Sequence, residues 1–499
     1  MRATIERAFE RGPGDNLRAE LRCAFSNGRD VISPASYTRA LAIVPALLIV
    51  SAPAWAQGAP GPSFIIVPSS AINPTTMQIA TSTLFQTVSA DFFLEDDGTM
   101  YVQTGDIPAM WLRDSSAQAK PYVRFVTHFQ TLGSLIRDVI ERNAKNVLTD
   151  PYANAFTAGY KIWEEKWEAD SLAYPVTLAY TYWRRTGDRA LFTPRLHWSL
   201  QHTVSTYQCE QHHASCSHYR SPLLVSGRGL DYAYTGMVWS AFRPSDDPVR
   251  YAYNIPQNMF VCVALRELAE MAQSGYGDAK LAAAATLLAD QIDAGIQRYG
   301  AIYEMDFGWI YAYEVDGYGH TLLADDANVP NLISATYYGF TTPGDPIYAN
   351  TRRFALSSAN PYYYSGSYAS GLGSPHTPTG WVWPLGLVMR AITAASPSET
   401  VSEIRTVQAT TQGGTLFHES FDPENPNRYT RTSFGWFEAE YAELLFRSTA
   451  GFDPDPLPAP AGALGLVNGA VATPLVVAPP QLWLNQDTCV DAMARLLQQ

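Results

Sequence analysis

The sequence predicts an all-α protein in which paired helices close into a toroid around one cleft. Apolar residues recur at helical spacing in many segments of the chain. These segments alternate as inner and outer helices, and loops rich in Gly, carboxylates and aromatic residues separate them. Because long ordered loops are usually functional, the loops at one end of the toroid are expected to carry the chemistry.

The first expected elements are a helix over 75–93, a short strand over 100–103, and one or two helices over 115–148. A helix through Tyr180 and Trp183 is expected to stop at Gly187. Later helices are expected over 189–207, 256–272, 278–297, 383–394, 399–411 and 433–447, with another starting at 332–338. The segments 311–330 and 358–379 are expected to be long loops.

The composition favours one large globular domain over several small ones. The chain has 499 residues, of which 46% are hydrophobic, with 12 Trp and 29 Tyr, so a sizeable core is possible. Its formal charge of −13 makes nucleic acid an unexpected partner. An acidic surface instead suits a neutral ligand, and sugars are neutral.

Both ends of the chain differ from the central region. Residues 40–50 are apolar and precede an Ala-x-Ala pattern ending at Ala56, which resembles a secretory signal peptide. We therefore expect a leader over 1–56, a linker over 57–74, a helical domain over 75–450, and a Pro/Ala-rich tail over 451–499. The protein would then be secreted or periplasmic, with no membrane contact after leader removal. The long segment before residue 40 leaves a downstream start or a membrane anchor as alternatives.

Two cysteines lie close together in a hydrophilic segment. In an oxidising compartment, Cys209 and Cys216 could close a small disulfide loop. The histidines nearby match no common zinc spacing, so no metal site is expected there. The sequence also lacks a phosphate loop, a dinucleotide fingerprint and a nucleophile elbow, which disfavours those enzyme classes.

The segment 105–115 has side chains suited to a sugar. Trp111 could stack on the apolar face of a pyranose ring, while Arg113 donates to hydroxyl groups and Asp114 accepts from them. The alternative is structural, since a Trp at a helix start beside an Arg–Asp ion pair is common in helical proteins.

Carboxylates gather in the loops beside aromatic residues. Glycoside hydrolysis needs two of them, one to protonate the leaving oxygen and one to activate water or attack the sugar. Asp246 and Asp247 are adjacent, so their charges would raise one pKa, although Asp residues near a helix start can also be caps. Glu419 could be aimed into a cleft or lie on the surface, and His376 could bind hydroxyl groups or be structural.

Seven motifs occur in order between about residue 75 and residue 446. They are TGDIPAMWLRDS (104–115), EADS (168–171) with Tyr174-Pro175, FRPSDD (242–247), YEVDG (313–317), DDANVP (325–330), SPH (374–376) and HESF (418–421). Together they resemble glycoside hydrolase family 125, the metal-independent exo-α-1,6-mannosidases.

The resemblance implies an (α/α)6 barrel that removes terminal α-1,6-linked mannose with inversion and without a cofactor. The ligand would be a mannose-containing oligosaccharide or glycan. The resemblance places the general acid at Asp246 or Asp247, with Asp246 preferred, and the general base at Glu419. Inversion would require the two carboxyl groups to lie about 6.5–9.5 Å apart. The substrate-binding residues that it implies are Trp111, Arg113, Asp114, Glu168, Asp170, Arg243, Asp326, His376 and His418.

One segment departs from the family pattern. After Arg431 the family usually continues Pro-Trp-Phe-Ala-Trp-Ala-Asn, whereas residues 432–440 here are TSFGWFEAE. The Asn is therefore replaced by Glu or Ala, which leaves the linkage specificity open. Two alternatives remain at this point: an α-glucoside hydrolase of the glucoamylase or trehalase type, and a secreted carbohydrate-binding protein without catalysis.

Overall fold

The computed structural model describes residues 74–127, 129–414 and 417–448. The expected leader over 1–56 and tail over 451–499 lie outside these residues, as does the linker except for its last residue. Within the described part of the chain, no helix combines the length and apolar character needed to cross a membrane.

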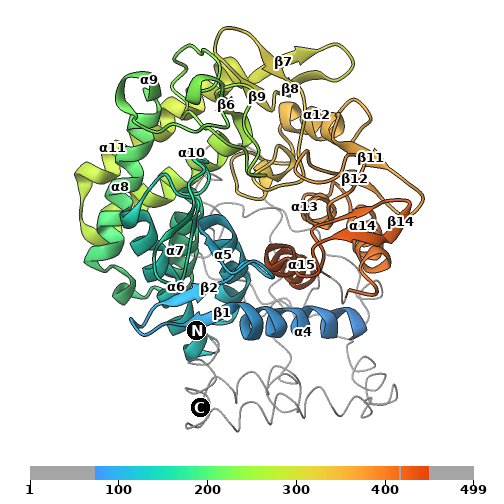
Figure 1. Ribbon diagram of the computed structural model, residues 1–499, viewed down its shortest axis with the longest axis horizontal. Helices are drawn as coiled ribbons and strands as arrows, with labels where there is room; N and C mark the ends of the chain where they lie inside the picture. The colour runs from blue at the N-terminus through green and yellow to red at the C-terminus, as the bar shows by residue number, and fades with distance from the viewer. Residues whose placement is uncertain (1–73, 128, 415–416, 449–499) are drawn as a thin grey trace, which may run out of the picture. The chain divides into compact units, whose positions relative to one another are not determined.

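An inner ring of helices surrounds the centre of the described domain (Figure 1). Each member contacts the next, and the last contacts the first, so the ring is closed. In order, its members are α5 (Leu112–Ala119), α7 (Ala173–Thr186), α10 (Ile255–Met271), the 3-10 helix η8 (Ile333–Thr336), α13 (Pro384–Ile392) and α15 (Gly435–Ser448). The expected helix at 332–338 is thus only a short 3-10 turn.

A second layer of helices packs outside this ring. It consists of α4 (Pro74–Asp91), α6 (Gln130–Thr149), α8 (Pro194–Glu210), α11 (Ala279–Gly295), α12 (Pro346–Ala355) and α14 (Pro397–Thr410). Nearly every residue of α10 is buried, whereas α11 buries one face and exposes the other. This difference is expected when one helix of each pair lies inside the barrel and the other faces solvent.

Polar caps explain where several outer helices begin. The Thr193 side chain accepts the backbone N–H of Leu196 at the start of α8, and the residues before it form a separate 3-10 turn, η4 (Arg189–Leu191). Helix α12 was not predicted. Its start has a recognisable signal, because Asp345 caps the helix and Pro346 occupies its first turn.

The loops between the helices fold into short antiparallel strands. The pairings are β1 (Phe92–Leu94) with β2 (Met100–Val102); β4 (Ala155–Phe156) between β3 (Met110–Trp111) and β5 (Ile162–Glu164); β9 (Glu314–Val315) between β6 (Tyr253–Asn254) and β10 (Thr321–Leu322); β7 (Ala301–Glu304) with β8 (Gly308–Tyr311); β11 (Tyr363–Ser365) with β12 (Ser370–Leu372); and β13 (Ser420–Asp422) with β14 (Asn425–Thr430). The segment expected to be a loop at 358–379 therefore contains the β11–β12 hairpin.

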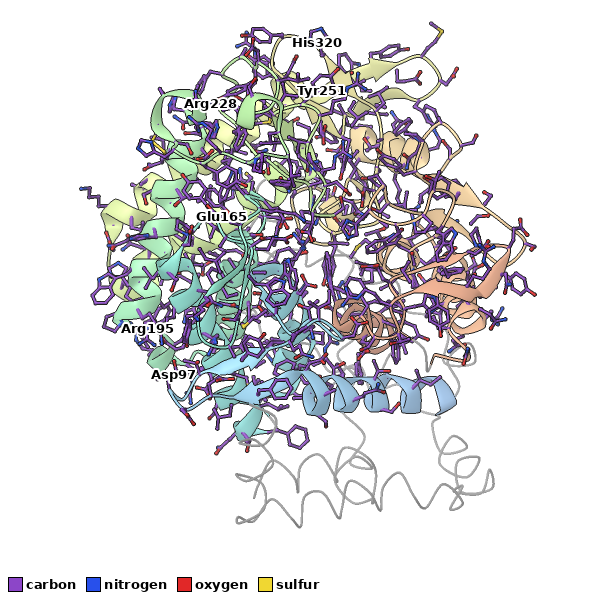
Figure 2. All side chains as sticks on the ribbon, in the orientation of Figure 1. Asp97, Glu165, Arg195, Arg228, Tyr251 and His320 are labelled. Atoms are coloured by element: carbon purple, nitrogen blue, oxygen red, sulfur yellow. A yellow bond between two sulfur atoms is a disulfide. The ribbon has the colours of Figure 1, made fainter. Side chains whose placement is uncertain are left out.

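The predicted disulfide between Cys209 and Cys216 is formed and joins the end of α8 to the short α9 (His213–Cys216). Charged side chains such as Asp97, Arg195 and Arg228 are exposed at the periphery (Figure 2). The charged groups described next are different, because most of them are buried.

Candidate active site

A cavity of about 170 Å³ lies among the loops and inner helix ends. Three carboxylates line it, together with four large aromatic rings and two arginines. The lining residues are Thr104, Ile107, Trp111, Arg113, Asp114, Pro244, Ser245, Asp246, Asn328, His376, Trp383, Glu419, Arg431, Phe434 and Trp436. Acidic groups and aromatic faces thus converge in one small space.

The two adjacent aspartates of the 242–247 motif have different surroundings. The turn is closed by backbone hydrogen bonds from Arg243 N–H to the Asp247 carbonyl (2.8 Å) and from Asp246 N–H to the Arg243 carbonyl (2.9 Å). Asp246 has a φ of 64°, a left-handed conformation that Asp adopts more readily than most residues. In this turn Asp246 lines the cavity, whereas Asp247 is not part of the lining.

Asp247 instead contacts residues at the side of the cavity. Its Oδ2 accepts a hydrogen bond from Ser245 Oγ (2.8 Å) and lies 3.8 Å from Nδ1 of His376. This carboxylate raises the pKa of His376 to about 9, with further contributions from the charges of Asp246 and Glu419. A protonated His376 can only donate hydrogen bonds, so it suits a ligand with hydroxyl acceptors.

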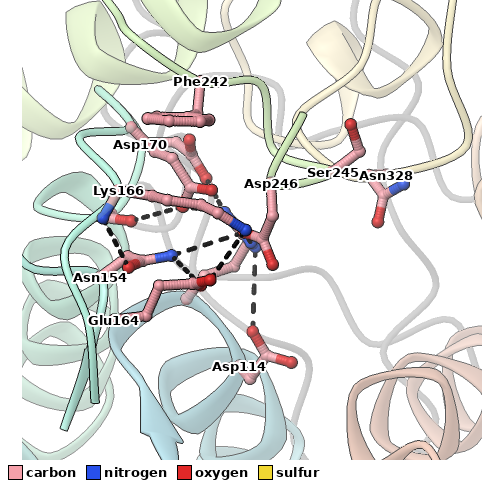
Figure 3. A network of polar contacts seen from close by, with 12 residues as sticks. Asp114, Asn154, Glu164, Lys166, Asp170, Phe242, Ser245, Asp246 and Asn328 are labelled. Carbon is pink, nitrogen blue, oxygen red and sulfur yellow. Dashed lines mark hydrogen bonds and ion pairs between the residues drawn. The ribbon is translucent and has the colours of Figure 1, made fainter. Parts of the chain in front are cut away.

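Arg113 is the centre of a buried ion cluster. Figure 3 shows three of the carboxylates of this network, Asp114, Asp170 and Asp246. Arg113 Nη1 binds Glu168 Oε2 (2.7 Å) and Asp170 Oδ2 (3.1 Å), while its Nη2 binds Asp246 Oδ1 (3.1 Å). Asp114 Oδ2 lies 3.8 Å from Nε. Burial raises the pKa of Asp114 to about 6 and that of Glu168 well above its usual value. The charge of Arg113 lowers both pKa values, but four carboxylates share this one guanidinium, and the charge of Asp246 raises both again.

Asn154 connects this cluster to the sheet formed by β3, β4 and β5. Its Nδ2 donates to Glu164 Oε2 (3.0 Å) and to Asp246 Oδ1 (3.5 Å), and its Oδ1 accepts the Lys166 N–H (3.1 Å). Figure 3 shows Glu164 and Lys166 on the same side of Asp246. No pattern in the sequence marks Asn154, since only tertiary contacts bring it to Asp246.

Glu419 reaches the cavity from the loop that precedes β13. Its N–H donates to the Thr430 carbonyl (3.1 Å), which fixes the residue just before β13. Arg431 Nη1 lies 3.5 Å from Glu419 Oε1. Arg431 is itself held by Asp106 Oδ1 (2.8 Å from Nε) and by the Thr104 carbonyl (3.0 Å from Nη2). Arg431 was not among the predicted site residues.

Comparison with known proteins supports a family assignment. The sequence profile of the metal-independent α-mannosidases, GH125, matches residues 73–161 and 158–446. The chain belongs to the GH125 family. The predicted family is therefore confirmed.

Two relatives of this GH125 chain share 36% sequence identity with it. The meiotically up-regulated gene 157 protein of Schizosaccharomyces pombe aligns over 386 residues, 69% of this chain and 75% of that protein. The metal-independent α-mannosidase of Streptococcus pneumoniae, solved in a non-productive complex with α-1,6-mannobiose, has a TM-score of 0.72 and covers 75% of this chain and 93% of its own.

More distant proteins have a similar fold. A bacterial glucoamylase complexed with acarbose has a TM-score of 0.52 at 15% identity, covering 71% of this chain and 51% of its own. At this identity the likeness concerns the fold alone. The predicted (α/α)6 fold is confirmed by these structural neighbours together with the closed ring of inner helices.

Five of the predicted substrate-binding residues of this GH125 chain are buried and are not part of the cavity lining: Glu168, Asp170, Arg243, Asp326 and His418. Arg243 Nε binds Glu314 Oε1 (2.6 Å), and Asp326 Oδ2 accepts from Ser374 Oγ (3.0 Å). Burial lowers the pKa of His418 to about 4. The His418 ring stacks on the Tyr429 ring, with 5.2 Å between the ring centres. These residues support the loops that carry the lining residues.

The segment that departs from the family pattern contributes aromatic rings to the cavity. Phe434 and Trp436 line it, and the Arg113 guanidinium lies 5.4 Å from the Trp436 ring centre. Glu438 is bound by Thr87 Oγ1 (2.8 Å) and Ser433 Oγ (3.2 Å), and Glu440 by the Tyr337 hydroxyl (3.0 Å). Neither glutamate is part of the lining, so the departure adds no carboxylate to the cavity.

Proposed function

We propose that this GH125 chain is an inverting exo-α-1,6-mannosidase, with Asp246 as general acid and Glu419 as general base. The main support is that both carboxylates line one small cavity together with Trp111 and Trp436. The cavity, at about 170 Å³, is smaller than the roughly 300–1,000 Å³ of pockets for drug-sized ligands. This size suits one terminal sugar ring, which an exo-acting enzyme must hold.

In the proposed reaction, Asp246 gives a proton to the glycosidic oxygen as the bond from that oxygen to the anomeric carbon breaks. The bonding electron pair stays with the leaving oxygen. Glu419 takes a proton from a water molecule, whose oxygen attacks the anomeric carbon from the opposite face. The products are β-mannose and a glycan shortened by one residue.

The cavity also offers donors for a sugar. The indole N–H groups of Trp111 and Trp436 are buried without a protein partner, and so is the hydroxyl of Thr104. Because these atoms have almost no accessible surface, their side chains would have to turn toward a bound sugar before its hydroxyls could accept from them and remove the cost of an unsatisfied buried group. With Asp114 and His376, these groups form the proposed subsite for the departing mannose. The α-1,6 linkage is supported by the disaccharide bound to the S. pneumoniae relative.

We also propose that the protein is secreted or periplasmic. The support is the signal-like pattern ending at Ala56 and the disulfide between Cys209 and Cys216, which is a bond typical of oxidising compartments. Mass spectrometry of the protein exported by its host should find a mature N-terminus at Gln57. An intact leader on the exported protein would contradict this proposal.

The reaction can be tested with the full-length protein and α-1,6-mannobiose, followed by proton NMR. Inversion predicts that β-mannose appears first and then mutarotates. Early α-mannose would contradict inversion. The α-1,2- and α-1,3-linked mannobioses and isomaltose are the controls, and faster release from any of them would contradict the proposed specificity.

A further inference from the structure

The cluster around Arg113 contains more negative than positive groups. Four carboxyl groups lie between 2.7 and 3.8 Å from one guanidinium, whose side chain is only 3% exposed. Lys166, whose charge also acts on Asp246 and Glu168, is itself paired with Glu164 at 2.8 Å. Because uncompensated buried charge is costly, we expect the cluster to hold at least one proton in its resting state.

The hydrogen bonds indicate which carboxyl group holds that proton. Asp170 is satisfied on both oxygens, since Oδ2 binds Arg113 and Oδ1 accepts from Gln257 Nε2 (2.9 Å). Glu168 is bound only at Oε2, by Arg113 (2.7 Å) and Ser171 Oγ (3.0 Å), while its Oε1 is buried with no donor. A protonated Glu168 could itself donate from this oxygen, which removes the deficit.

Asp246 is the acceptor for this proton. It occupies Nη2 of Arg113 while Glu168 occupies Nη1, so the two carboxyl groups are neighbours on one guanidinium. Burial raises the pKa of Glu168, and the negative charge of Asp246 raises it further, although the charge of Arg113 acts in the opposite direction. Burial alone would raise the pKa of Asp246 too, but the neighbouring Glu168 carboxyl group and the charges of Arg113, Lys166 and His376 lower it.

We propose that Glu168 holds the proton that Asp246 delivers, so that the general acid of this site is a pair of carboxyl groups. The inference rests on the function proposed above. Glu168 is fully buried and outside the cavity lining, so it acts through Asp246 as a positioning residue.

The proton balance follows from this arrangement. Before the reaction, Glu168 is protonated and Asp246 is ionised. As negative charge develops on the leaving oxygen, the proton moves from Glu168 to Asp246, and Asp246 passes it to that oxygen. Both carboxyl groups are then ionised beside Arg113. Asp246, whose side chain is 18% exposed, recovers a proton from solvent and returns it to Glu168.

Replacing Glu168 with Gln keeps the shape and removes the proton store. The groups that influence Glu168 stay in place: Arg113, Asp170, Asp246, Lys166 and Tyr219. In E168Q the amide carries no acidic proton, so Asp246 must be protonated by itself beside Arg113. The basic limb of kcat/KM for a substrate with a poor leaving group should therefore move to lower pH.

The test compares two substrates. Protonation of the leaving group matters for α-1,6-mannobiose and hardly at all for 2,4-dinitrophenyl α-mannoside. We expect E168Q to lose about 10²-fold or more of kcat/KM on mannobiose, within the roughly 10²–10⁴-fold value of general acid catalysis, and much less on the aryl mannoside. The matched control is D170N, because Asp170 is equally buried and binds the same nitrogen of Arg113. D170N should lower both activities in equal proportion.

Equal losses on the two substrates in E168Q would overturn the inference, as would a selective loss of the same size in D170N. A wild-type protein that cleaves neither mannoside would instead refute the proposed function. Thermal melting checks that each variant is folded. If E168Q does not fold, E168D serves in the same comparison, because its shorter side chain withdraws the carboxyl group from Asp246. It should show a smaller but still selective loss on mannobiose, and an unselective loss would overturn the inference.

Discussion

Asp246 and Glu419 line the same cavity and each lies beside an arginine, but the two arginines differ. Arg113 is 3% exposed and faces four carboxyl groups, whereas Arg431 is 18% exposed and faces Glu419 and Asp106. The Asp246 side of the site has excess buried negative charge and retains a proton. The Glu419 side pairs its carboxylate with a more accessible cation. The acid side and the base side therefore differ in how many carboxyl groups the arginine contacts and in how deeply that arginine is buried.

The largest effect should come from removing the arginine on the acid side. R113M leaves Glu168, Asp170 and Asp246 without their shared cation, so the free energy of unfolding should fall by about 3–5 kcal/mol and activity should be lost. The counterpart R431M breaks a partly exposed pair and should cost less than about 1 kcal/mol. Urea unfolding at pH 7 measures both. Similar losses of stability in R113M and R431M would contradict the proposed difference between the two arginines.

On the base side, E419Q should reduce kcat by about 10²–10⁴-fold, because the amide cannot accept the proton of the attacking water. Binding should be largely retained, since the amide has nearly the same shape. Single-turnover kinetics and calorimetric titration with α-1,6-mannobiose separate these effects. Full activity of E419Q would reject its assignment as the base.

The acid side also predicts a dependence of stability on pH. Burial raises the pKa of Asp114 from 3.8 to about 6, so the folded state binds more protons than the unfolded state between these values. Its contribution to stability is therefore complete below about pH 4 and is lost as pH rises to about 6. D114N should reduce this decline by up to roughly 3 kcal/mol, as measured by urea unfolding between pH 4 and 7. An unchanged pH profile in D114N would contradict the buried setting of Asp114.

The smallest effect is expected for D247N. Asp247 contacts Ser245 and His376 and does not line the cavity, so its loss weakens the placement of His376 without removing a reacting group. The cost should be that of one hydrogen bond, about 0.5–1.5 kcal/mol, seen as a rise in KM. A fall in kcat as large as that of D246N would show that the turn does not separate the two aspartates.

The sequence predicted those features that depend on residues close to one another along the chain. Helical periodicity located long helices such as α10 and α11, and the motifs located Trp111, Asp246 and Glu419. It did not predict α12, which has only ten residues, although its buried residues Tyr348, Thr351 and Phe354 recur at helical spacing and its Asp-Pro start also signals a helix.

Residues that depend on tertiary arrangement were harder to predict. Asn154 and Arg431 reach the site from segments distant along the chain, and no local pattern marks them. The family resemblance implied that His418 binds substrate, and no pattern in the sequence shows which way its side chain points relative to that of Glu419. In the structure Glu419 lines the cavity, whereas His418 packs on Tyr429.

The central claim is that Asp246 is the acid and Glu419 the base, and a leaving-group comparison of D246N with E419Q tests it most directly. We predict that D246N loses activity on α-1,6-mannobiose but keeps most of its activity on 2,4-dinitrophenyl α-mannoside, because that leaving group needs no proton. E419Q should lose activity on both, since each needs an activated water. Equal losses on the two substrates in D246N, or a selective loss in D247N instead, would contradict the account.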